Sequence, residues 1–182
     1  MRKRNKPLGK KIKPQIWVFC EGETEKAYVA HLRAQYRIPI EIVTRVSGTA
    51  ISSKYIGKCK KDKPAHPKDL DFLMYDADVP AVLQRLQSIP NAILLLSDPV
   101  IELWFLLHFK NQSTACSTDD CVRDLHNRTG YVKGAINGKL ARKLNECIVK
   151  ACERARKLPQ AKHPSSNVYL FIETLDQIKR EP

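Results

Sequence analysis

The chain has 182 residues, enough for one domain with a sizeable core, and its 43% hydrophobic content is ordinary for a globular protein. No apolar run approaches the ~20 residues of a membrane-spanning helix, and no signal-peptide core follows the basic N-terminus, so we expect a cytoplasmic protein. The net charge of +13 indicates a polyanionic partner, most commonly nucleic acid, although lysine-rich faces can also serve solvation alone.

The positive charge is concentrated in three segments. Residues 1–14 hold seven Lys and Arg with no acid, residues 54–68 hold six lysines with one Asp, and residues 133–162 hold nine Lys and Arg with two Glu. We expect the first segment to be a flexible basic arm. The third segment either contacts phosphates or forms a solvated helix face. Nucleic-acid contacts are predicted for six lysines of the first two segments: Lys10, Lys11, Lys13, Lys58, Lys60 and Lys61.

Short apolar runs alternate with helical patterns along the first 110 residues. The predicted strands are residues 16–20, 38–46, 71–75 and 92–96. The predicted helices are residues 24–37 with Thr24 as N-cap, 49–61, 80–88, and a helix that starts within SDPVIELWFLLHF. This alternation predicts a parallel α/β sheet, and the uninterrupted run AILLL indicates a strand covered on both faces.

The second half of the chain changes character. From about residue 118 onwards the pattern predicts only helices, at 118–127, 138–158 and 166–179. We therefore expect three regions: a flexible basic arm over 1–14, an α/β core over 15–110, and a helical extension over 111–182 packed on that core.

Two pairs of cysteines share a C-x4-C spacing, Cys116 with Cys121 and Cys147 with Cys152. This is not the C-x2-C spacing of a zinc ribbon, and the second pair lies in a helical pattern, where residues five apart do not share a face. Cytosolic thiols stay reduced, so the sequence favours buried or inert cysteines over disulfides or structural zinc.

Four carboxylates follow the predicted strands at their carboxyl ends. Glu21 comes directly after the first strand, Asp76 and Asp78 end the third, and Glu102 begins the helix after the fourth. Ligands of open parallel sheets bind at this edge, so we expect the four side chains to gather there. Carboxylates that close repel one another unless a cation binds, and hard oxygen ligands suit Mg²⁺ or Mn²⁺.

Each of these features also has a simpler interpretation. An Asp-x-Asp after a strand is common turn or capping chemistry. Glu23 and Glu25 near a helix start, and Glu102 likewise, can merely complement the helix dipole. His108, on an apolar helix, is more often a core histidine than a ligand. The combination of a strand-terminal Glu-Gly and a strand-terminal Asp-x-Asp is more specific than either part.

Four segments resemble known proteins. VFCEGETEK followed by FLMYDAD resembles the Toprim domain of primases, topoisomerases and OLD-type nucleases. Within that group the chain is most similar to the RloB / AbiLii-like proteins of bacterial defence loci, through EGETE, DAD and the most specific segment, SDPVIELWFLLHF. The late PSSNVYLFIETL also resembles the C-terminal segment of that family. The resemblance covers nearly the whole chain.

The resemblance implies a four-stranded parallel Toprim-like sheet flanked by helices, with a role for each motif residue. Glu21 would be the acid/base or a metal ligand, Asp76 and Asp78 would hold Mg²⁺ (or Mn²⁺), and Glu102 would be a further ligand. The implied catalytic residues are thus Glu21, Asp76 and Asp78. Gly22 would allow a tight turn after the strand.

The same resemblance implies a reaction class. The chain is too short to carry the tyrosine domain of a topoisomerase and shows no template-binding modules of a primase, which leaves a metal-dependent nuclease that hydrolyses DNA or RNA in phage defence or abortive infection. An ATPase partner is suggested, and self-association is left open. The alternative is a non-catalytic subunit that binds nucleic acid or an effector and acts with the ATPase.

Overall fold

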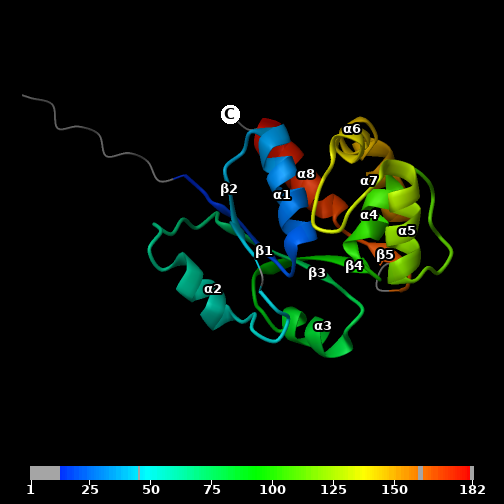
Figure 1. Ribbon diagram of the computed structural model, residues 1–182. Coiled ribbons are helices and arrows are strands. Elements are labelled where there is room, and N and C mark those ends of the chain that lie inside the picture. Colours follow the sequence, from blue (N-terminus) through cyan, green and yellow to red (C-terminus); the bar gives the residue numbers. More distant parts are fainter. Residues whose placement is uncertain (1–12, 45, 160–161, 181–182) are drawn as a thin grey trace, which may run out of the picture.

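The computed structural model describes residues 13–44, 46–159 and 162–180 (Figure 1). The predicted arm, including Lys10 and Lys11, therefore lies outside the described residues, apart from its last two positions. No helix in the described ranges is both long and apolar enough to cross a membrane.

A single sheet forms the centre of the fold. Its strands are β1 (Ile16–Cys20), β2 (Ile40–Val43), β3 (Leu70–Asp76), β4 (Ala92–Asp98) and β5 (Ser165–Ser166), in the order β2-β1-β3-β4-β5. The four strands predicted from the sequence are parallel to one another, whereas β5 pairs antiparallel with β4. The sheet is therefore mixed and five-stranded, and the prediction of a purely parallel four-stranded sheet was incomplete.

The fifth strand comes from the region predicted to be only helical. It has two residues and no apolar alternation, so the sequence carries no periodic signal for it. Asn167 extends its pairing, because its backbone N–H donates to Leu96 O at 3.0 Å and its side-chain amide bonds both Leu96 N (2.6 Å) and Leu94 O (3.0 Å). The C-terminal extension thus completes the sheet.

Eight helices surround the sheet in the described part of the chain. They are α1 (Glu23–Tyr36), α2 (Ser53–Lys60), α3 (Pro80–Gln87), α4 (Ile101–Leu107), α5 (Thr118–Thr129), α6 (Gly138–Glu146), α7 (Ile148–Lys157) and α8 (Tyr169–Arg180). In Figure 1, α2 and α3 lie on one face of the sheet, while α1, α4 and α8 lie on the other.

Two helix predictions were wrong in detail. The N-cap of α1 is Gly22, and Thr24 lies inside the helix, because the chain enters helical geometry directly after β1 and Gly22. The single helix predicted over 138–158 is two helices that meet at Cys147, whose φ of −113° and ψ of 15° depart from helical values. The apolar spacing continues across this break, so the periodicity could not reveal it.

Each face of the sheet has its own core. On the α1/α4/α8 face, Val18 and Phe72 pack among large buried side chains such as Trp104. On the α2/α3 face, Trp17 and Leu73 pack in a smaller cluster. Successive strand residues alternate between these clusters, as the pleat requires. All seven residues of α4 are buried, so this helix is held rigidly between the sheet and the C-terminal helices.

Candidate functional site

Two of the predicted site residues meet at the carboxyl end of the parallel strands. Glu21 follows β1, and its backbone N–H donates to Met74 O of β3 at 3.3 Å. The backbone N–H of Asp76, the last residue of β3, donates to Glu21 Oε2 at 3.4 Å. Asp76 Oδ1 in turn accepts a hydrogen bond from Ile101 N at 2.9 Å. These bonds join the ends of β1 and β3 to the start of α4, where Glu102 lies.

Glu102 is fully buried, with 0% of its surface exposed. Its Oε1 accepts a hydrogen bond from the Tyr131 hydroxyl at 2.7 Å, whereas its Oε2 is buried with no hydrogen-bond partner in the described structure. The Tyr131 hydroxyl also lies 3.4 Å from Thr24 Oγ1, which accepts from Gly134 N at 3.0 Å. The loop between α5 and α6 therefore fixes one oxygen of Glu102 and leaves the other unsatisfied.

Glu25 belongs to the same cluster, which the sequence interpretation missed. It is only 5% exposed, and its Oε2 accepts the backbone N–H of Gly22 at 2.9 Å. Glu21 precedes α1 and Glu25 lies in its first turn, so helical periodicity could not show that the two belong together. Gly22 lies in the short bend between β1 and α1. Its φ of −135° suits any residue, but an added Cβ would lie 3.0 Å from Glu25 Oε2.

The carboxylates destabilise one another's charges. Burial, followed by the charges of Glu25, Glu102 and Glu21, raises the pKa of Asp76 to about 8. Burial also raises the pKa of Glu25, with contributions from Glu102 and Glu21. The pKa of Glu21 is raised by burial and by exposed Asp78. The site thus attracts either protons or a cation.

The donor set fits a hard divalent cation chemically. All its side-chain donors are carboxylate oxygens, and the orphaned Glu102 Oε2 lacks a partner that a cation would supply. Within the described ranges, however, no three His, Cys, Asp or Glu side chains are arranged to hold one ion together.

A protein-family comparison identifies the chain. The family described as RloB-like protein matches residues 16–175. The chain belongs to the RloB-like family. No curated protein and no solved structure gave a significant match. The family resemblance seen in the motifs is confirmed, whereas the Toprim assignment stays a prediction.

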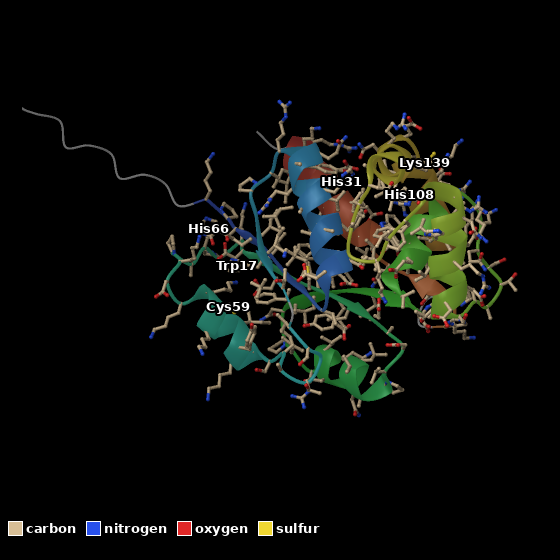
Figure 2. All side chains as sticks on the ribbon, viewed as in Figure 1. Trp17, His31, Cys59, His66, His108 and Lys139 are labelled. Atoms are coloured by element: carbon tan, nitrogen blue, oxygen red, sulfur yellow. The ribbon has the colours of Figure 1, made fainter. Side chains whose placement is uncertain are left out.

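The described lysines predicted to bind nucleic acid lie at the opposite end of the sheet of this RloB-like protein. Lys60 Nζ contacts both carboxylate oxygens of Asp71, at 2.7 and 3.0 Å, and lies 5.8 Å from the Trp17 ring centroid. Asp71 precedes Asp76 by five residues of β3, about 17 Å at ~3.3 Å per residue. Trp17 and Cys59 mark this amino end in Figure 2.

Lys58 and Lys61 are exposed at and just beyond the end of α2, and Lys13 is exposed shortly before β1. These lysines therefore share the amino end of the sheet with Lys60. Their role in nucleic-acid binding stays a prediction.

His108 is a core histidine in the RloB-like protein. It is 1% exposed, its Nδ1 lies 3.0 Å from Trp104 O, and burial lowers its pKa to about 4. It lies at the C-terminal end of α4, whereas Glu102 lies in the first turn of that helix. The histidine is buried in the core as expected, but it is not fully satisfied, because its Nε2 is buried with no hydrogen-bond partner in the described structure.

Proposed function

We propose that this RloB-like protein is a Mg²⁺- or Mn²⁺-dependent nuclease of Toprim type, which hydrolyses phosphodiester bonds of DNA or RNA in a phage-defence system. The observation that carries the proposal is the buried oxygen Oε2 of Glu102, which has no partner in the described structure and belongs to a carboxylate cluster at the carboxyl edge of the sheet.

An unsatisfied buried carboxylate oxygen is unfavourable for folding. Buried polar atoms are nearly always hydrogen-bonded, and an unpaired buried charge costs several kcal/mol. Hydrophobic residues fill the rest of the first turns of α4, so an apolar side chain would be the stabilising choice at Glu102. A carboxylate there is explained by a ligand that satisfies it in the working protein.

The chain's own residues supply the remaining parts of such a centre. Asp76, Asp78 and Glu102 would hold the cation, with Glu25 beside them, and the cation would supply water activation and neutralisation of the leaving oxygen. Glu21 is half-buried at the edge of this cluster, and its raised pKa suits a group that takes and returns a proton.

One observation favours the second candidate function, a non-catalytic subunit that binds nucleic acid or an effector beside an ATPase partner. The carboxylates are not arranged around a common point in the described structure. A partner that rearranges the carboxyl edge would then be needed before any cation binds.

The deciding experiment compares two aspartates of the same strand. Purified protein is incubated with single-stranded DNA, double-stranded DNA and tRNA in Mg²⁺, Mn²⁺ or EDTA, and Mn²⁺ binding is measured separately by electron paramagnetic resonance. Asp76→Asn should abolish both cleavage and Mn²⁺ binding, while Asp71→Asn, at the other end of β3, should leave both intact.

Three results would change the assignment. Mn²⁺ binding without cleavage, alone or with an ATPase partner, supports the binding subunit. If Asp76→Asn keeps both cleavage and Mn²⁺ binding, the carboxyl edge is not the metal centre. Cleavage that survives EDTA contradicts a metal-dependent nuclease.

A further inference from the structure

The first C-x4-C pair forms a direct sulfur contact at the start of α5. Cys116 Sγ lies 3.3 Å from Cys121 Sγ, although both residues are free thiols. The proposed nuclease activity uses neither of them. The contact is therefore a separate feature of the molecule, in a C-x4-C motif whose spacing favoured buried or inert thiols.

Helix capping explains why these two cysteines meet. Ser117 is the N-cap of α5: its Oγ accepts from Asp120 N at 3.1 Å, and Asp120 Oδ2 accepts from Ser117 N at 3.2 Å. This capping box places the residue before the cap, Cys116, against the fourth helical residue, Cys121, as in a hydrophobic staple. The non-covalent contact alone stabilises the helix start.

The two thiols differ in access. Cys121 is 0% exposed, and burial, followed by its contact with Cys116, raises its pKa. Cys116 is half-buried and lines a surface hollow of about 350 Å³, together with Lys110 and Arg123. A small oxidant can therefore reach Cys116 before Cys121. The two basic side chains of this hollow are paired, Lys110 with Asp124 and Arg123 with Asp120.

We propose that Cys116 and Cys121 are an oxidative modification site that a peroxide converts into a disulfide. The Cys116 thiolate attacks one peroxide oxygen, the O–O bond breaks, and Cys116 becomes a sulfenic acid while hydroxide leaves and takes up a proton. The Cys121 sulfur then attacks Cys116 Sγ, and the sulfenic hydroxyl leaves with the Cys121 proton as water. Two thiols and one hydrogen peroxide thus give one disulfide and two waters.

The disulfide would act on a chain of contacts that reaches the sheet. The backbone N–H of Cys116 donates to His163 Nε2 at 3.2 Å, and His163 Nδ1 lies 2.8 Å from Asp98 Oδ1 at the end of β4. Nε2 accepts in this arrangement, so Nδ1–H donates to Asp98. Oxidation would fix Cys116 to α5 and so hold the α4–α5 loop against the carboxyl end of β4.

The second pair with the same spacing provides a control within the protein. Cys147 joins α6 to α7, and its carbonyl already accepts the backbone N–H of Ala151 at 2.9 Å. The five-residue step to Cys152 therefore runs along helical backbone, where such residues face different directions. Cys116 instead precedes its helix and folds back onto it.

The test is a titration of the full chain with hydrogen peroxide, followed by non-reducing peptide mapping and a thermal melt. We expect a disulfide between Cys116 and Cys121 before any modification of Cys147 or Cys152. The oxidised protein should have a higher Tm than the reduced protein, and dithiothreitol should reverse the change. Cys116→Ser keeps the backbone bond to His163, so it should fold normally and lose the shift.

Several outcomes would overturn the proposal. A sulfenic or sulfinic acid at Cys116 without the disulfide contradicts the role of Cys121. Equal oxidation of Cys147 and Cys152 shows that the sulfur contact confers no selectivity. A peroxide-induced Tm shift that persists in both Cys116→Ser and Cys121→Ala assigns it to another group.

Discussion

Two aspartates of β3 lie at opposite ends of one strand and in opposite electrostatic surroundings. Asp71, at the amino end, pairs with Lys60 through both carboxylate oxygens. Asp76, at the carboxyl end, is surrounded by Glu21, Glu25 and Glu102, which help raise its pKa to about 8. The same residue type in the same strand is thus neutralised by a cation at one end and held among like charges at the other.

This difference separates an end of the sheet whose charges are paired within the chain from the end that carries the candidate site. At the amino end, ion pairs such as Lys63–Glu41 satisfy the charges within the chain itself. At the carboxyl end, acidic groups are held close together, which lowers stability. Such an arrangement is typical of sites where a bound ligand neutralises the charge. Substitutions at the two ends should therefore have opposite effects on stability and unequal effects on activity.

The largest expected effect is on cleavage. Asp76→Asn should lower nuclease activity by at least ~100-fold, because one ligand charge is lost while the hydrogen bond from Ile101 N can be kept. Asp71→Asn should change activity by less than about twofold. Initial rates on a fluorescent oligonucleotide measure both, and equal losses in the two variants would remove the distinction between the ends.

The next effect is a pH-dependent change in stability of the metal-free protein. A carboxyl whose pKa rises from 3.8 to about 8 on folding binds more protons when folded, so the free energy of unfolding should fall as pH rises between these values. Asp76→Asn should flatten this decline and melt higher than wild type at pH 8, by ~2–4 °C for each kcal/mol regained. Thermal melts in EDTA from pH 4 to 8 provide the measurement.

Two further results sharpen this prediction. Mn²⁺ should raise the Tm of wild type at pH 8 but not that of Asp76→Asn. A wild-type Tm that rises steadily from pH 4 to 8 in EDTA would contradict the raised pKa.

A smaller effect is expected at Tyr131, which positions Glu102. Tyr131→Phe removes the 2.7 Å hydrogen bond to Glu102 and should weaken Mn²⁺ binding ~10- to 100-fold. Tyr75→Phe is the matched control, since Tyr75 is equally buried at 1% and its hydroxyl donates to Val46 O, also at 2.7 Å. If the two variants bind Mn²⁺ with comparable affinity, the Tyr131 hydroxyl does not position Glu102 for the cation, and Tyr131 serves only in packing.

The smallest effect concerns the basic segments. Deletion of residues 1–13 should reduce the slope of log binding constant against log salt by about 0.9 for each phosphate that the arm neutralises in the wild type. Lys60→Ala should change the slope least, because Asp71 already neutralises this lysine. Fluorescence anisotropy with a labelled oligonucleotide at several salt concentrations tests both, and an unchanged slope after the deletion would exclude the arm from binding.

The sequence by itself determined the parallel part of the sheet and the place of its acidic residues. Short apolar runs marked β1, β3 and β4, because strands covered on both faces are largely apolar, and β-branched residues marked β2. Glu21 and Asp76 could be placed at one edge because parallel strands end on the same side. The RloB-like family was visible in the same motifs.

Only the tertiary structure decided the contacts that cross the chain. Tyr131 reaches Glu102 from 29 residues away, and β5 pairs with β4 across 69 residues at Ser97 and Ser166. Local periodicity carries no information about such pairs, because they depend on how the C-terminal helices pack on the sheet. The burial of Glu25, whose position near a helix start suggested only a dipole partner, was likewise visible only in the structure.

The placement of the lysines was also a tertiary outcome. Their clustering along the sequence indicated a polyanion partner, but α2 carries Lys60 back to the amino end of β3, away from the carboxylates. Sequence composition sets the total charge, whereas the crossover between β2 and β3 sets which end of the sheet receives it. The basic segments and the acidic cluster could each be predicted from the sequence. The distance of about one strand length between them could not.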